Sequence, residues 1–326
     1  MKKHLTKVII VAVCALALGP LCTGFFGPEW RARWMLAWAA NEYQNGQPEE
    51  AETTLRRASE LSRELATDPE FWKLRFDIVF NKEKPSSVAI KTLFDESVSH
   101  ISRLQQPQQP VVAAFVANMF RLNRETDLAI EVLEFHLPPI SQRVANDNNT
   151  IAYFRSLAKK KLDIAMQEID AALIADGTQS EMFLDTKAWV LHGLGQDANA
   201  LPFANEALKK LYSKIERMGN VRPADRREFH ASLYADVDVK TQSVDAEKKI
   251  DSKVSKKNIS DLNRLDALKI RYPYLSQTAI DEIAKTIAAL RFHRACILDE
   301  LKRTEESDRD YAWLDCFGFT ETDKLN

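Results

Sequence analysis

The chain has 326 residues and a formal net charge of -2, with 28% charged and 45% hydrophobic residues. A charge so close to neutral gives no bulk field that would attract nucleic acid or acidic substrates. Only 9 glycines occur, and Ala, Leu, Glu, Lys and Arg dominate, a composition that favours helix over strand. None of the four cysteines forms a Cys-x-x-Cys pair, so no zinc or redox site of that type is predicted.

The first distinctive segment is an apolar run at the N-terminus. Lys2, Lys3 and Lys7 precede an uncharged run over residues 8–28. The run is about as long as the ~20 residues that cross a bilayer, and lysines before it favour a cytoplasmic N-terminus. We expect residues 1–28 to form a signal anchor that holds the remaining chain on the periplasmic or extracytoplasmic side of a membrane. Cleavage as a signal peptide, which gives a secreted or periplasmic product, is the alternative.

Pairs of helical segments follow. The apolar spacing predicts first and second helices over 31–44 and 49–65, 71–80 and 87–104, 111–122 and 126–135, 149–159 and 162–175, and 180–194 and 197–215. A small residue near the start of each second helix recurs every 35 to 40 residues, at Ala51, Ala89, Ala129, Ala165 and Ala200. Such a period is typical of two-helix repeats that bury their core by stacking on their neighbours. The sequence therefore predicts an all-α solenoid over residues 29–215, preceded by one transmembrane helix or signal peptide.

The rhythm stops at residue 216 and returns near the C-terminus. Residues 216–275 are expected to form an irregular, charged connecting segment with short helices, and its lysine-rich part, 236–260, is interpreted as a solvated linker. Residues 276–326 are expected to form a final helix pair, with helices over 276–303 and 308–317. The charged residues Asp308, Arg309, Asp310 and Asp315 on the last helix suit the polar outer face of a capping repeat.

The clearest repeat covers residues 181–211. Small residues stand at Ala188, Ala200 and Ala207, and Gly195 occupies the turn. In this spacing the chain resembles the tetratricopeptide repeat family, whose consensus has small residues at the eighth, twentieth and twenty-seventh places. Close approach of the paired helices is the physical reason for those small residues. Other α-solenoids share that logic, so a different helical repeat is the alternative.

Two of the copies depart from that consensus. Tyr153 falls at the eighth place of the fourth copy, and in the second copy Asp77 and Glu96 fall at the eighth and twenty-seventh places. The resemblance covers roughly residues 31–215 and 277–320. It implies a concave groove, lined by the first helices, that binds a polypeptide. Projected onto this chain, the groove residues are Tyr43, Gln44, Arg75, Asn81, Lys82, Asn118, Arg121, Asp185, Trp189 and His192.

Motifs for chemistry are not apparent. The sequence has no phosphate-binding loop, dinucleotide glycine pattern, His-Glu-x-x-His or Gly-x-Ser-x-Gly. We therefore expect no catalytic residues, metal or cofactor, and no nucleic acid or small-molecule substrate. The expected function is a non-catalytic scaffold that binds other proteins and contacts the lipid bilayer through residues 8–28. The alternatives are a soluble secreted or periplasmic adaptor, and an accessory subunit of an enzyme complex.

Overall fold

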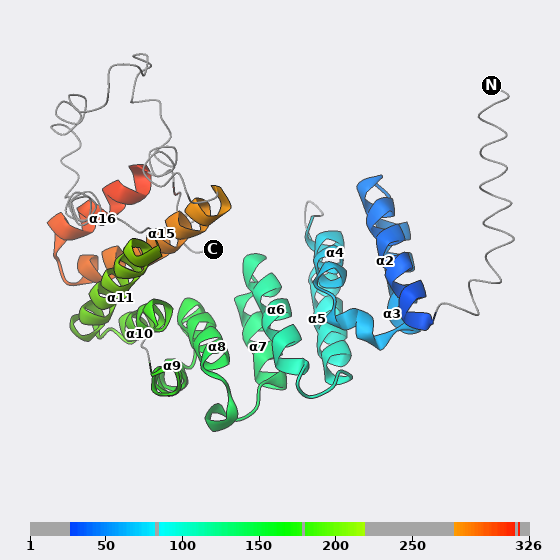
Figure 1. The fold of residues 1–326 in the computed structure, drawn as a ribbon, viewed down its shortest axis with the longest axis horizontal. Helices are drawn as coiled ribbons and strands as arrows, with labels where there is room; N and C mark the ends of the chain where they lie inside the picture. Colours follow the sequence, from blue (N-terminus) through cyan, green and yellow to red (C-terminus); the bar gives the residue numbers. More distant parts are fainter. Residues whose placement is uncertain (1–26, 82–84, 178–179, 219–276, 317–318, 320–326) are drawn as a thin grey trace, which may run out of the picture. The chain divides into compact units, whose positions relative to one another are not determined.

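The computed structural model describes residues 27–81, 85–177, 180–218, 277–316 and 319 (Figure 1). Twelve α-helices and two short 3-10 helices lie in these residues, and no strand occurs among them. None of the described helices is long and apolar enough to cross a membrane. The predicted anchor lies outside the described residues except for Gly27 and Pro28, and so do Lys82 and nearly all of the predicted connecting segment.

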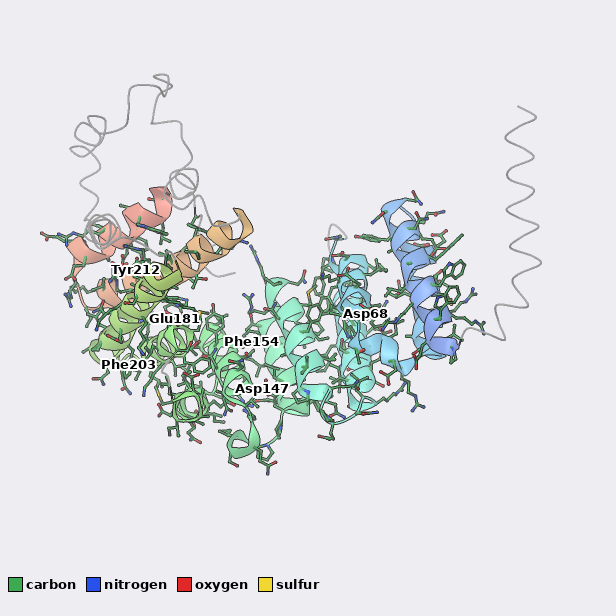
Figure 2. All side chains as sticks on the ribbon, viewed as in Figure 1. Asp68, Asp147, Phe154, Glu181, Phe203 and Tyr212 are labelled. Atoms are coloured by element: carbon green, nitrogen blue, oxygen red, sulfur yellow. The ribbon has the colours of Figure 1, made fainter. Side chains whose placement is uncertain are left out.

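The chain divides into an N-terminal unit, residues 1–139, and a C-terminal unit, residues 140–326. The helices of the N-terminal unit are α2 (Pro28–Gln44), α3 (Pro48–Leu61), η1 (Arg63–Thr67), α4 (Pro69–Phe80), α5 (Ser87–Ser102), α6 (Gln109–Leu122) and α7 (Thr126–His136). Proline stands at the start of several of them, where its missing N–H costs nothing. The Asp68 side chain caps α4 by accepting a hydrogen bond from the Glu70 N–H (Figure 2).

The C-terminal unit contains η2 (Ile140–Gln142), α8 (Ala145–Ala158), α9 (Leu162–Asp176), α10 (Glu181–Gly193), α11 (Asp197–Met218), α15 (Gln277–Glu300) and α16 (Thr304–Cys316). No bound of a predicted helix differs from the observed one by more than four residues. The all-α prediction is therefore confirmed for the described residues.

Consecutive helices pack as antiparallel pairs, and the pairs stack within each unit. In the N-terminal unit α4 contacts α2 and α6, whereas α5 contacts α7. In the C-terminal unit α10 contacts α8 and α15. The first helices of successive pairs thus form a layer of their own in each unit. This stacking of helix pairs is compatible with a tetratricopeptide-like repeat fold.

One type of turn closes five of the six described pairs. A residue with left-handed φ ends the first helix, at Gly46, Arg124, Lys159, Gly195 and Lys302. The N–H of the residue after it then bonds to the carbonyl five residues earlier, as from Gln47 to Glu42 and from Gln196 to Leu191. This is the hydrogen bond of a Schellman motif, which satisfies carbonyl groups left open at a helix end. Because the turn is the same, the first helix of each of these five pairs ends in the same register.

The small residues follow from this register. Seven residues before each left-handed residue stands a fully buried alanine, at Ala39, Ala117, Ala152, Ala188 and Ala295. The residue predicted for this place in the fourth copy was Tyr153, but that pair has one extra turn residue, Lys161, which also has left-handed φ. Allowing for the extra residue puts Ala152 at the eighth place. The fourth copy therefore departs from the others only in the length of its turn.

The second pair is built differently. Its connection between α4 and α5 is longer, and Ala89, unlike the other four repeated alanines, is only half-buried. Large side chains of α4 fill the core here, among them Trp72, Phe76 and Ile78. The Phe76 ring packs edge-on against Phe120 of α6 with centroids 4.8 Å apart. Bulky side chains thus replace the close approach of small residues in this pair.

Candidate functional site

The ten predicted groove residues separate into groups. Lys82 lies outside the described residues. Six others belong to the N-terminal unit and three to the C-terminal unit. All nine of the described residues lie on first helices or at their ends, so each unit is considered by itself.

A polar contact joins the ends of α2 and α4. The Asn81 amide donates to the Tyr43 hydroxyl over 2.8 Å, and that hydroxyl donates to the Asp77 carbonyl oxygen over 3.3 Å. Gln44 and Asn81 are exposed, and Tyr43 is half-buried. Tyr43 and Asn81 therefore hold two adjacent repeats together while an exposed surface remains around them.

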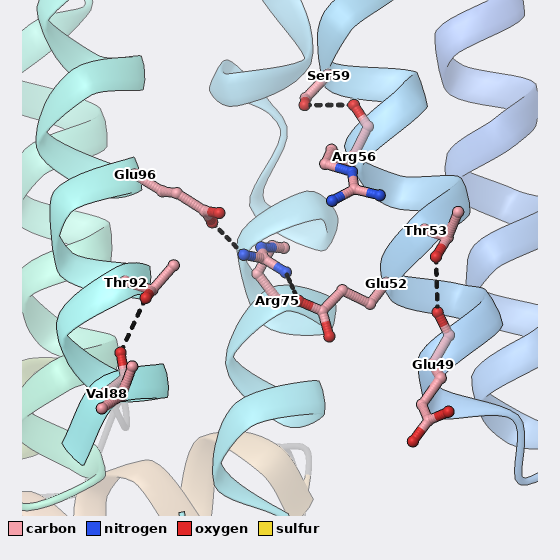
Figure 3. A network of polar contacts seen from close by, with 9 residues as sticks. All are labelled: Glu49, Glu52, Thr53, Arg56, Ser59, Arg75, Val88, Thr92 and Glu96. Atoms are coloured by element: carbon pink, nitrogen blue, oxygen red, sulfur yellow. Dashed lines mark hydrogen bonds and ion pairs between the residues drawn. The ribbon is translucent and has the colours of Figure 1, made fainter. Parts of the chain in front are cut away.

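Arg75 has a different environment, because it lies inside the unit (Figure 3). The Arg75 side chain is only 8% exposed. Its guanidinium pairs with Glu52 of α3 over 3.5 Å and with Glu96 of α5. Both carboxylates are partly exposed, at 48% and 38%. We define Arg75, Glu52 and Glu96 as the Arg75 network. This network ties three helices together and leaves little of the guanidinium for a partner.

Asn118 and Arg121 on α6 interact with each other. The Arg121 Nε and Nη2 atoms donate to Asn118 Oδ1 over 3.1 and 3.0 Å. Both residues are half-buried. The pair places an amide and a guanidinium in contact with each other on α6, one of the first helices of this unit.

In the C-terminal unit the three predicted residues meet at one place. The indole of Trp189 stacks on His192 and on His293 of α15, with centroids 4.8 and 4.3 Å away. His293 Nδ1 lies 2.8 Å from Asp185 Oδ2, and His192 Nδ1 lies 2.6 Å from Asp197 Oδ1. Each imidazole is thus oriented by one carboxylate. We call Asp185, Trp189, His192 and His293 the histidine–tryptophan cluster.

Burial limits what this cluster can do chemically. His293 is 1% exposed, Asp185 4% and Trp189 8%. The Asp–His contact resembles the pair that orients a general base, but no substrate can reach an imidazole that is covered in this way. The cluster instead joins α10 to α15 through Asp185 and His293, which are 108 residues apart along the chain. His192 is its most accessible member, being only half-buried.

Two buried charge networks in the C-terminal unit were not predicted. The expectation that Asp310 lies on a polar outer face was wrong, because its side chain is fully buried in one of them. Asp310 of α16 accepts from Arg291 and Arg294 over 2.7 Å, and Arg291 also donates to the Tyr212 hydroxyl over 3.1 Å. Burial raises the pKa of Tyr212. Burial opposes the charge of Arg294, but its hydrogen bond to Asp310 and the attraction of nearby negative groups together outweigh this and raise its pKa. We call these residues the Asp310 network.

The second network surrounds Glu168 on α9. Glu168 accepts from Arg155 over 2.9 Å and from Arg143 over 2.7 Å, and its side chain is 0% exposed. The only sequence signal for either network is a charged residue at a position where helical spacing predicts an apolar one. Such a signal identifies a buried charge but does not identify its partner.

An open hollow of about 460 Å³ lies among α9, α10 and α11. Lys187, Pro202 and Phe203 help to line it, and Phe203 is labelled in Figure 2. The Lys187 ammonium sits 4.7 Å from the centre of the Phe203 ring and 2.8 Å from Asp170 Oδ1. This is a second surface of the C-terminal unit that could receive a side chain of a partner.

Among the described residues, no three His, Cys, Asp or Glu side chains are grouped so that they could hold a metal ion. The geometry offers accessible polar groups on the first helices of the N-terminal unit, whereas the predicted residues of the C-terminal unit are buried except for half-buried His192. No family model matches the chain, and no curated protein matches it.

Proposed function

We propose that this chain is a non-catalytic scaffold of the tetratricopeptide type, anchored in a membrane by residues 8–28 and binding polypeptide partners through its first helices. Its N-terminus would be cytoplasmic and its repeats extracytoplasmic. The observation that carries the proposal is the stacking of first helices into a layer in each unit. A rigid layer of this kind can present side chains from successive helices to one extended peptide, with little loss of conformational entropy on binding.

The accessible predicted residues support this use of the layer. Gln44 and Asn81 are exposed, and Asn118 and Arg121 are half-buried. Amide and guanidinium groups can pair with the backbone and carboxylates of a peptide. The contacts between Tyr43 and Asn81 and between Arg121 and Asn118 fix these groups before a partner arrives.

Photo-crosslinking tests this proposal in the membrane of the native host. We would place p-benzoylphenylalanine singly at Gln44, Asn81 or Asn118 of the full chain and identify the adducts by mass spectrometry. Discrete polypeptide adducts are expected from these positions. Matched controls are Glu131 and Ile174, which are exposed on the second helices α7 and α9. Adducts from the controls alone would move binding away from the first helices.

The hollow in the C-terminal unit is the competing surface. The photoreactive residue at Asn199, which lines the hollow, reports on it separately. An adduct found only at Asn199 would replace the first-helix layer with the hollow. If the adduct is an enzyme whose activity changes on depletion of this chain, the accessory-subunit alternative gains support over a general scaffold.

Membrane anchoring needs a separate test. The intact chain is expected to stay in the membrane pellet through carbonate and high-salt washes, because residues 8–28 are nearly as long as a bilayer is thick. Terminal sequencing gives the opposing outcome. A mature N-terminus near Phe25 would refute the anchor and favour the secreted or periplasmic adaptor.

A further inference from the structure

Three tryptophans form an exposed row on α2. Trp30, Trp34 and Trp38 are 48%, 54% and 50% exposed. Their four-residue spacing puts them on one side of the helix. The opposite side carries the buried residues of α2, which are Ala32, Leu36 and Ala39. We call this row the tryptophan face.

The tryptophan face differs from the rest of the molecule. The chain has six tryptophans, and the other three, Trp72, Trp189 and Trp313, are at least nine-tenths buried. An indole is large and mostly apolar, so three half-exposed indoles on one helix make an apolar surface of a size that usually has a binding role. The Trp34 and Trp38 rings lie 5.5 Å apart, and Trp38 Nε1 donates to Glu42 Oε1 over 2.6 Å.

The place of α2 in the chain, directly after the predicted anchor, points to a lipid surface as the occupant of this face. The uncharged run over residues 8–28 ends at the first residue of α2, so no linker separates them. Gly27 has φ -59° and ψ 167°, which is not helical. Gly27 therefore interrupts helical geometry, and α2 begins as a helix of its own at Pro28. A helix that begins at the membrane surface can lie along that surface.

The chemistry of the face also fits a bilayer surface. Trp30 and Trp38 are about 12 Å apart along the helix axis, so the whole row can lie at one depth if α2 is parallel to the membrane. Tryptophan prefers the boundary between headgroups and acyl chains, where its ring is in an apolar layer and its N–H meets water or esters. Arg31 and Arg33, which are exposed beside the row, can pair with lipid phosphates.

We propose that the tryptophan face lies in the interfacial layer of the same bilayer that residues 8–28 cross, and that it fixes the orientation of the N-terminal unit on the membrane. This inference rests on the proposed anchor. A lipid surface is the occupant to which the proposal commits. A second copy of the chain, packed face to face, is the competing occupant and an outcome of the test.

Quenching of tryptophan emission by brominated lipid tests the inference. The full chain would be reconstituted in vesicles of phosphatidylcholine and phosphatidylglycerol, with and without brominated acyl chains. Brominated lipid is expected to remove up to half of the emission, because three of the six tryptophans lie on this face. The W30Q/W34Q/W38Q variant, which retains only the buried tryptophans, should lose no emission to brominated lipid.

The outcomes separate the inference from the anchor on which it rests. If the chain floats with the vesicles but brominated lipid does not quench it, the inference fails and the anchor stands. If the chain does not float with the vesicles, the anchor itself fails. Unquenched emission together with cross-linked dimers that W30Q/W34Q/W38Q abolishes would assign the face to a second copy.

Cysteine alkylation gives a readout that does not use fluorescence. Ala37 lies between the tryptophans on α2 and is exposed, and Glu50 is exposed on α3. In vesicles, Ala37→Cys should react several-fold more slowly with a charged maleimide than Glu50→Cys. Each reaction rate is measured on the proteolytic peptide that carries the introduced cysteine. Adding W30Q/W34Q/W38Q should remove that difference. Equal rates in the chain with its native tryptophans would contradict the proposal.

Discussion

The Arg75 network and the Asp310 network use opposite charge arrangements for the same task. In the N-terminal unit one buried arginine pairs with two carboxylates that are 48% and 38% exposed. In the C-terminal unit the fully buried carboxylate of Asp310 pairs with Arg291 and Arg294. Arg291 is itself buried. Each network joins three helices of one unit: α3, α4 and α5 in the N-terminal unit, and α11, α15 and α16 in the C-terminal unit.

The two networks differ in whether water can hydrate the charged groups that remain after one partner is removed. If the Arg75 guanidinium is removed, Glu52 and Glu96 can be hydrated. If the Asp310 carboxylate is removed, the Arg291 guanidinium stays buried and loses this ion pair. Uncompensated buried charge is far more costly than a weakened surface ion pair. The stability of the C-terminal unit should therefore depend on its network more strongly than that of the N-terminal unit, and the predictions below test this ranking.

The largest effect is expected for Asp310→Asn. The change removes the carboxylate with which both Arg291 and Arg294 pair, and we expect a loss of about 3–5 kcal/mol in the free energy of unfolding of this unit. The loss is measured by denaturing the full chain in detergent and monitoring unfolding through hydrogen exchange of the α15 and α16 peptides. The matched control, Asp308→Asn, alters an exposed carboxylate on the same helix and should be nearly neutral. A small effect at Asp310 would remove the proposed difference between the networks.

Ala200→Leu should have an intermediate effect. Ala200 is fully buried in the first turn of α11, where the two helices of the pair approach closely. Extra methyl groups should overpack that contact and cost roughly 1–3 kcal/mol, measured by the same exchange of α10 and α11 amides. Ala198→Leu, at an exposed position of the same helix, should change little. Equal stability of the two variants would show that this contact tolerates a larger side chain.

Arg75→Met should cost less, about 1 kcal/mol, since methionine keeps part of the buried volume and both carboxylates gain water. Hydrogen exchange of α3, α4 and α5 peptides measures the change. Arg56→Met, at an exposed position of α3, is the control. A loss as large as that of Asp310→Asn would reverse the ranking of the two networks.

The smallest effect concerns pH in the N-terminal unit. Burial lowers the pKa of His136, and burial with nearby Arg103 lowers that of His100, from an ordinary value of 6.5. The unfolded chain therefore binds protons first as the pH falls, so the unit should lose stability below about pH 6.5 and keep it above. The double variant His100→Gln and His136→Gln should flatten this dependence in α5 and α7 exchange. An unchanged slope would assign the pH response to other groups.

Much of the fold follows from local signals in the sequence. Gly46 and Gly195 mark turns because left-handed φ favours glycine, and Ala188 and Ala200 mark close packing because a pair of helices needs small residues there. The same turn at Arg124, Lys159 and Lys302 has no such marker, since its hydrogen bonds involve only the backbone. The extra Lys161 therefore shifted the predicted register of the fourth copy by one residue.

The candidate site was less accessible to sequence reasoning. Helical spacing placed Asp185, Trp189 and His192 on one first helix, and the structure brings them together. Helical spacing could not predict that His293 joins them, because its contact with Trp189 depends on how α15 stacks on α10. Nor does spacing distinguish an exposed Arg75 from one enclosed by Glu52 and Glu96. Pairing between distant helices is a property of the stack, and local patterns do not encode it.

The contact between α11 and α15 has a consequence for the order of folding. Most contacts in the C-terminal unit join neighbouring helices, which can meet after closing short loops. α15 contacts α11 although residues 219–276 separate the two helices along the chain, and the entropy lost on joining two segments grows with their separation. The pair α10 and α11 should therefore form first and act as the template on which α15 and α16 assemble. Refolding should show a late phase confined to the last two helices, when the Arg291 side chain finally meets Tyr212.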